Sequence, residues 1–348
     1  APQNRAAWFG ADVGRVLLEL AQEHYRAPDH MLLHKFWRDL LHVMDRGVVF
    51  SHVADHVHFL RRNALDAKFK RRASLFRTLA EHERFVALNV PHDVRADEVD
   101  ADAVLGAFGR RHFLVALLLD EVNRELDGPV PPRGKAIDTL RELVERHDHD
   151  ERFLADPNHA SAAGGGAGAT LRTHLANLYF PLLAIVANKA ELVVDKLTRG
   201  ERLHLHKCVL FVLKNCSRQL FADWFFVQPQ RMQEGLLAAL EAAVDVFRRD
   251  MERTLEAEER DRWTTVCLVI DEVVYMLAAT LVEELSREGN RLFGALWAVV
   301  RALFANGTPR FVPHLYATVH VLVSTYRAPL LHHGGDNNAY GEQLVHEL

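Results

Sequence analysis

The sequence predicts an all-α protein, organised as an armadillo- or HEAT-like solenoid of paired antiparallel helices. Apolar residues recur at spacings of three and four along most of the 348 residues. Pro and Gly cluster between these periodic stretches, and the alternating runs and hairpin turns typical of strands are absent. Pairs of such helices would form units of about 40–47 residues, the length of armadillo or HEAT repeats, so roughly seven or eight would fit here.

The periodic stretches give the positions of the expected helices. They cover residues 13–25, 34–44, 112–126, 133–146, 171–190, 201–216, 231–254, 261–286, 290–305 and 313–326. Breaks are expected around Pro28 and at 89–93, 127–134, 306–309 and 332–338. Two flexible loops are expected, a polar and acidic one near 92–103 and a low-complexity one, NHASAAGGGAGA, at 158–169.

Composition indicates a protein of the cytoplasm that does not bind nucleic acid. Lys and Arg total 42 against 47 Asp and Glu, a net charge of −5, whereas nucleic-acid proteins carry a clustered positive excess. The three cysteines form no CxxC pair and no even disulfide framework, which favours a reducing compartment. The most apolar long stretch, 263–285, carries Asp271 and Glu272 near its middle, so it predicts a buried helix rather than a membrane span.

Three histidines in SHVADHVHFL (51–60) raise the question of a metal site. His52 and His56 are four apart and would share one face of a helix, with His58 two positions further on. The zinc-protease pattern needs Glu directly after the first His, and Val53 stands there instead. The sequence identifies no third ligand. We therefore expect a partly exposed helix face.

Two further histidine groups suggest chemistry that their spacing does not support. HDHDE (147–151) contains the His147–Asp148 dipeptide typical of helical metal-dependent phosphohydrolases, but it lies at the polar end of a predicted helix. HLHKC (204–208) places its ligand types two apart, so they diverge around a helix. A metal-dependent hydrolase using His147 and Asp148 is kept as an alternative.

A basic cluster, RRNALDAKFKRR (61–72), is the candidate interaction surface. We define the predicted patch as its six cations, which face only Asp66 locally: Arg61, Arg62, Lys68, Lys70, Arg71 and Arg72. Such a patch predicts contact with an acidic partner or with an anionic membrane surface at the membrane periphery, against the alternative of a solvated face between two helices.

Five stretches, in order, resemble the DOCK (dedicator of cytokinesis) family. They are MDRGVVF (44–50), LFRTLAEHERFVALNVP (75–91), FGRRHFLVALLLDEVNREL (108–126), HDHDERF…LRTHLANLYFPLLAIV (147–186) and VLFVLKNCSRQLFADWF (209–225). The third is similar to the zizimin branch. Phe113, Leu117, Tyr179 and Leu182 match the motifs and are expected to be core residues.

The resemblance implies that residues 1–348 are the armadillo-like scaffold between the lipid-binding DHR-1 and catalytic DHR-2 domains, and that they contain neither domain. The parent would be a guanine nucleotide exchange factor for Rho-family GTPases, Cdc42 or Rac. This segment would then hold no catalytic residue, metal or cofactor. Its partners would be other domains of the parent chain, and the GTPase would bind through DHR-2. A free-standing armadillo-type adaptor acting through the predicted patch is the second alternative.

Overall fold

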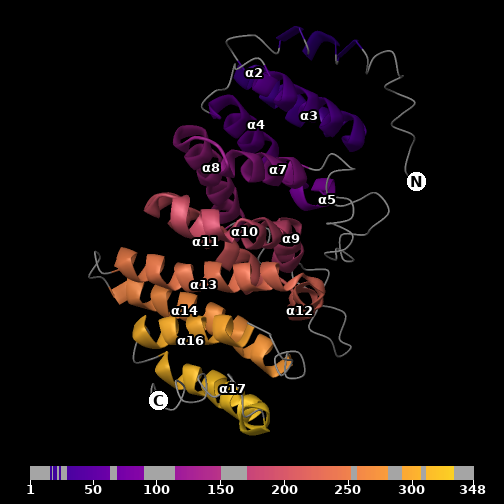
Figure 1. Cartoon of the computed structure of the whole chain (residues 1–348). Coiled ribbons are helices and arrows are strands. Elements are labelled where there is room, and N and C mark those ends of the chain that lie inside the picture. Colours follow the sequence, from indigo (N-terminus) through magenta and orange to yellow (C-terminus); the bar gives the residue numbers. More distant parts are fainter. Residues whose placement is uncertain are drawn as a thin grey trace, which may run out of the picture. The chain divides into compact units, whose positions relative to one another are not determined.

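The chain is all-α, as the sequence predicts. The computed structural model describes residues 16–17, 19–21, 23–24, 30–62, 69–89, 114–149, 171–251, 257–280, 292–306 and 311–332, and within these ranges every regular element is a helix (Figure 1). None of the helices in these ranges is long and apolar enough to cross a membrane.

The helices follow one another along the chain. They are α2 (His30–Leu40), α3 (Arg46–Arg62), α4 (Lys70–Ala80), α5 (Phe85–Asn89), α7 (Leu114–Leu126), α8 (Val130–His149), α9 (Leu171–Tyr179), α10 (Pro181–Asn188), the π-helix η5 (Leu192–Lys196), α11 (Arg199–Asn215), α12 (Arg218–Val227), α13 (Gln230–Met251), α14 (Ala257–Thr280), α16 (Leu292–Asn306) and α17 (Val312–His332).

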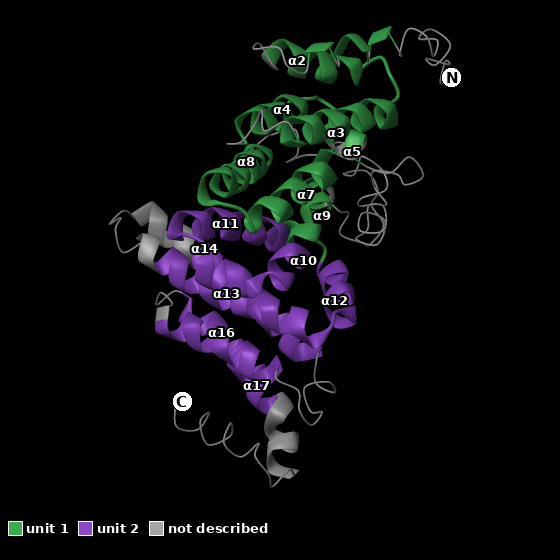
Figure 2. Ribbon diagram, turned by 45° about the horizontal axis from the view of Figure 1, so that its top comes forward, with its two compact units in different colours: residues 1–182, 215–217 green, residues 183–214, 218–348 purple. Residues whose placement is uncertain are grey.

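The chain divides into two compact units, coloured separately in Figure 2. Unit 1 contains residues 1–182 and 215–217, and unit 2 contains residues 183–214 and 218–348. The expected loops near 92–103 and 158–169, Lys68 and Phe113 lie outside the described residues, as does part of the expected helix 13–25.

Unit 1 is organised around α4. Helices α2, α3, α7 and α8 all pack against it, and α7 also packs on α8 and α9. The side of α4 that faces these neighbours is apolar, and Leu75 and Phe76 have no exposed surface. Because four helices share one short helix as their packing surface, the position of α4 determines the geometry of the unit.

Unit 2 contains two stacked helical hairpins. Helix α13 packs on α14 and α16 packs on α17, while α13 also packs on α16 and α14 on α17 (Figure 1). Each hairpin therefore buries one surface within itself and a second against the next hairpin. Stacking of this kind is the building principle of armadillo and HEAT repeats.

The stretch expected to be a buried helix is α14. Asp271 is buried and accepts a hydrogen bond from the Thr318 hydroxyl of α17 at 2.6 Å. Burial raises the pKa of the Asp271 carboxyl, although the Thr318 hydrogen bond opposes this shift. Glu272, one position on, is exposed and forms an ion pair with Arg218 at the start of α12.

Two helix boundaries differ from the sequence expectation because of proline. The expected helix 171–190 is interrupted at Phe180, and α10 starts at Pro181, which lacks an N–H and disfavours helical backbone in the residue before it. Conversely, the expected break at 127–134 is shorter, because α8 begins at Val130 and holds two prolines in its first turn. The first turn tolerates proline since its N–H groups have no intrahelical acceptor.

Gly235 of α13 marks a close approach between helices of unit 2. A Cβ atom at this position would lie 2.3 Å from the Ala187 carbonyl oxygen of α10 and 3.2 Å from the Ala190 Cβ. The first distance is far inside van der Waals contact and involves backbone. Only glycine lets the two helices approach this closely.

We expect Gly235→Ala to lower the free energy of unfolding by about 1–3 kcal/mol, because the added methyl must push α13 away from α10. Gly200→Ala in α11 is the matched control, since a Cβ there meets no atom within 4 Å. Urea denaturation followed by circular dichroism would measure both variants. Equal stability of the two variants would contradict the close approach.

Candidate functional site

The structure places the predicted patch at the end of α3 and the start of α4, and it divides the patch into internal and external cations. Arg72 is 3% exposed and forms ion pairs with two carboxylates of α7, Glu121 and, at 3.0 Å, Glu125. Arg61 of α3 also forms an ion pair with Glu121, which has no exposed surface. These four side chains form a buried ion-pair cluster that joins α3, α4 and α7.

The entry into α4 positions Arg72 for this cluster. Phe69 caps the helix in the left-handed region, at φ 60° and ψ 13°, and is fully buried. Left-handed backbone is unfavourable for a bulky side chain and persists only where packing holds it. The Arg72 guanidinium carbon lies 4.5 Å from the centre of the Phe69 ring, so a cation–π contact adds to that packing.

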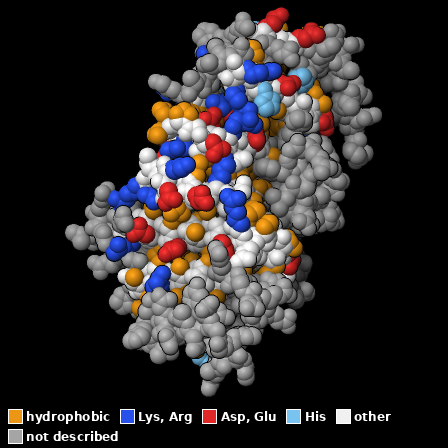
Figure 3. All heavy atoms as spheres, in the orientation of Figure 1, with side chains coloured by type: hydrophobic (Ala, Val, Ile, Leu, Met, Phe, Trp, Pro, Cys, Tyr) orange, Lys and Arg blue, Asp and Glu red, His pale blue; other side chains and the backbone are white. Residues whose placement is uncertain are grey.

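The predicted patch is therefore smaller than the sequence suggested. Arg62 and Lys70 are exposed, and Arg71 is half-buried. The expectation that the cluster faces only Asp66 is wrong, since Glu121 and Glu125 of α7 neutralise its internal part. On the face of the molecule seen in Figure 3, basic and acidic side chains of the described residues lie interspersed.

The histidines of α3 are packing residues more than surface residues. His56 is buried, with its ring centre 6.1 Å from that of His34 on α2, so the expectation of an exposed face is wrong for this residue. The half-buried His52 stacks parallel to the Trp37 ring at 6.4 Å, and burial lowers its pKa. His58 is half-buried, and its pKa is also lowered by burial. Across the described ranges, no three side chains of His, Cys, Asp or Glu converge as metal ligands would.

His147 is likewise internal, which the sequence did not indicate. Its ring lies 4.5 Å from that of Phe85, and its Nδ1 is 3.3 Å from the Tyr179 hydroxyl. Asp148 points elsewhere and forms an ion pair with Arg172 at 3.4 Å. The two residues that a phosphohydrolase would use together therefore serve separate contacts.

Of the four expected core residues, two are buried, one is half-buried, and Phe113 lies outside the described residues. Tyr179 and Leu182 have no exposed surface, as expected. Leu117 is half-buried, because α7 turns Leu118 and Leu119 toward the core in its place.

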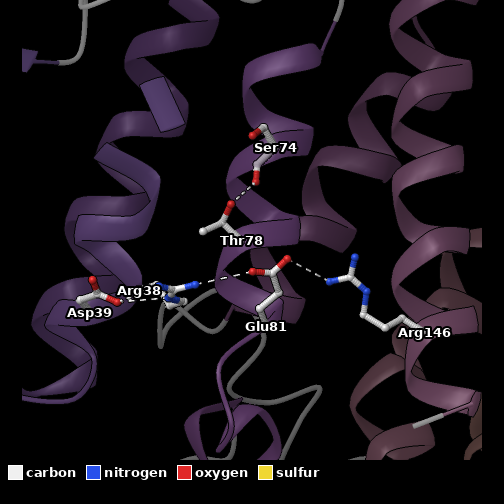
Figure 4. A network of polar contacts seen from close by, with 6 residues as sticks. All are labelled: Arg38, Asp39, Ser74, Thr78, Glu81 and Arg146. Carbon is white, nitrogen blue, oxygen red and sulfur yellow. Dashed lines mark hydrogen bonds and ion pairs between the residues drawn. The ribbon is translucent and has the colours of Figure 1, made fainter. Parts of the chain in front are cut away.

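A bridge around Glu81 was not anticipated from the sequence. Glu81, directly after α4, forms ion pairs with Arg38 of α2 at 3.6 Å and with Arg146 of α8 at 3.4 Å (Figure 4). Arg38 also contacts its neighbour Asp39 at 3.1 Å. One carboxylate thus links three helices of unit 1. No local sequence pattern predicts such a bridge, since its members are distant in sequence.

His206 of α11 is the most strongly perturbed histidine. Its ring is completely buried in unit 2, and neither ring nitrogen has a hydrogen-bond partner among the described residues. Burial, followed by repulsion from Arg202, lowers its pKa from 6.5 to about 4. It is therefore neutral in the folded protein near neutral pH.

The buried ion-pair cluster should dominate the stability of unit 1. We expect Glu121→Ala to cost about 3–5 kcal/mol, because it leaves the buried Arg72 charge without its nearest carboxylate. Asp120→Ala is the matched control, as Asp120 pairs at 2.9 Å with Arg124 on the exposed side of the same helix, a contact worth about 0.3–0.5 kcal/mol. Urea unfolding measures both. A Glu121→Ala loss no larger than that of the control would show that the cluster is not a constraint.

His206 should make stability depend on pH. The unfolded side chain binds a proton near pH 6.5 and the folded one near pH 4, so the unfolded state holds more protons between these values and stability falls as the solution is acidified. The full loss is about 3 kcal/mol by pH 4. His206→Leu should flatten this dependence in urea unfolding at several pH values. The control His320→Leu, at an exposed position of unit 2, should retain it.

Comparison with known proteins gives partial similarities to one family. The chain is 26% identical over 155 residues to human dedicator of cytokinesis protein 9, 28% identical over 185 residues to mouse dedicator of cytokinesis protein 6, and 24% identical over 197 residues to human dedicator of cytokinesis protein 7. These alignments cover 42%, 43% and 46% of this chain but only 7–8% of the relatives. No family profile and no solved structure matches. The similarities support a relation of this helical chain to the dedicator of cytokinesis proteins, over somewhat less than half of its length.

Proposed function

We propose that this chain is a helical scaffold segment of a DOCK-type guanine nucleotide exchange factor for Rho-family GTPases. The carrying observation is its similarity to dedicator of cytokinesis proteins 9, 6 and 7. Within such a protein the segment lies between DHR-1 and DHR-2 and fixes their relation. The motif in α7 favours the zizimin branch, and with it Cdc42 ahead of Rac as the GTPase of the parent.

Packing inside each unit supports a scaffold role. The stacked hairpins α13–α14 and α16–α17 repeat one packing mode, which is how armadillo-like solenoids extend. In unit 1, the buried ion-pair cluster ties together α3, α4 and α7, which are separated in sequence. Bonds of this kind hold helices at defined positions, which is the property that a spacer between two domains requires.

Only the exposed cations of the predicted patch are part of this proposal. Arg62 and Lys70 are exposed at the ends of neighbouring helices, and we assign them to contact with an acidic surface of another domain of the parent protein or of a membrane. A free-standing adaptor has less support, because Arg61 and Arg72 are already engaged by Glu121.

The test of the proposal is a nucleotide-release assay. We expect the purified chain to leave the release of fluorescent GDP from Cdc42 and from Rac unchanged, because in this scheme exchange depends on DHR-2. Magnesium chelation with EDTA provides the positive control for release. Acceleration by the chain alone would overturn the scaffold assignment and make this segment the catalytic one.

A second test of the proposal uses the related human protein. We expect that replacing the matched 155-residue region of human dedicator of cytokinesis protein 9 with the aligned region of this chain preserves its exchange activity. Loss of activity in a folded replacement would contradict a shared scaffold role.

A further inference from the structure

Two histidines stack against each other where α2 meets α4. His42 follows the end of α2 and His82 follows the end of α4, and their ring centres are 4.2 Å apart with an angle of 29° between the planes. His82 is buried, whereas His42 is exposed. The pair therefore combines one solvent-exposed ring with one internal ring.

The hydrogen bonding of His82 fixes which nitrogen can take up a proton. The backbone N–H of Arg84 donates to His82 Nδ1 at 3.0 Å, so the neutral ring carries its hydrogen on Nε2. Protonation must occur at Nδ1 and must break this bond. The same tautomer leaves no free lone pair on His82 for a metal ion.

The surroundings of the pair disfavour positive charge. Burial lowers the pKa of His82, the neighbouring His42 lowers it further, Glu83 opposes this, and Arg84 and Arg38 add to the lowering. The nearby carboxylates already have cationic partners: Asp39 and Glu81 contact Arg38, Glu81 also contacts Arg146 of α8, and Glu83 contacts Arg84 at 3.6 Å. A proton on His82 therefore meets the His42 ring and two arginines.

We propose that the stacked His42–His82 pair makes the attachment of α2 to α4 sensitive to pH, so that protonation at mildly acidic pH releases α2 from the rest of unit 1. Neutral rings stack and hold the ends of the two helices together. A charged pair repels, and His82 loses its bond to Arg84. The remaining Glu81 bridge is solvent-exposed, and such pairs contribute little to holding a helix in place.

Release of α2 would uncover apolar surface. Leu33, Trp37 and Leu40 of this helix are buried within unit 1. Their exposure changes what the unit can bind, so the pair would act as a switch as well as a structural contact. Other titratable contacts along α2 involve His34 with Ser74 of α4 at 3.2 Å, and His52 and His56 of α3.

The test is local hydrogen exchange in the full chain. We expect the protection factors of amides in α2, corrected for intrinsic rates, to fall about tenfold between pH 7.5 and pH 5.5, while those of α7 change much less. The double variant H42F/H82N keeps an aromatic ring against residue 82 and an acceptor for the Arg84 N–H, but neither side chain titrates. In this variant the fall should disappear. His149→Asn, at an exposed position of α8, should behave as the wild type.

Each outcome decides the question. Unchanged α2 protection in the wild type, or an equal fall in H42F/H82N, overturns the proposal, and the second result would point to His34, His52 or His56. If the double variant does not fold, His42→Phe decides alone, since it removes the imidazole stacked on His82 and must reduce the fall. Loss of protection in α7 to the same extent as in α2 would indicate global unfolding and would also overturn the proposal. His206 lies in unit 2, so its titration is separate from the amide protection measured in α2.

Discussion

The buried pairing of Arg72 with Glu121 is the constraint on which unit 1 depends. Neither side chain reaches solvent to any useful extent, so each charge must be satisfied by the protein itself. Arg61 and Glu125 complete the cluster with one further charge of each sign. Because its members come from α3, α4 and α7, the three helices cannot shift relative to one another without leaving a charge unpaired. Helices α2 and α8 pack on α4 in turn, so their positions follow from the same requirement.

Unit 2 meets the same need for a defined geometry by other means. Its stacked hairpins are held mainly by apolar packing, and Gly235 sets how close α13 can come to α10. One buried carboxylate, Asp271, accepts a hydrogen bond across the α14–α17 seam from Thr318. Burial also raises the pKa of the nearby Cys267 thiol to about 12, which keeps that thiol neutral. Unit 1, by contrast, concentrates buried charge in one cluster.

Sequence patterns predicted the helical class and most helix positions, because both follow from local periodicity. The buried Asp271 also agrees with the expectation of a buried helix at 263–285, whereas Glu272 is exposed. The errors concern contacts between distant segments. Arg72 looked like a surface cation because its partners lie 49 and 53 residues away. One signal was available: Glu121 lies on the same face of its helix as Leu118 and Val122, where a carboxylate needs a buried partner.

Histidine burial escaped prediction for a related reason. His147 sits among polar neighbours in the sequence, yet its ring contacts those of Phe85 and Tyr179, and the buried ring of His56 lies near that of His34 on α2. Local polarity says little about a side chain that is amphipathic and of intermediate size. In this chain such rings occur at the seams between helices. At the seam between α2 and α4, burial lowers the pKa of His82, so the stacked pair is the contact of α2 through which the proposed switch would respond to acid.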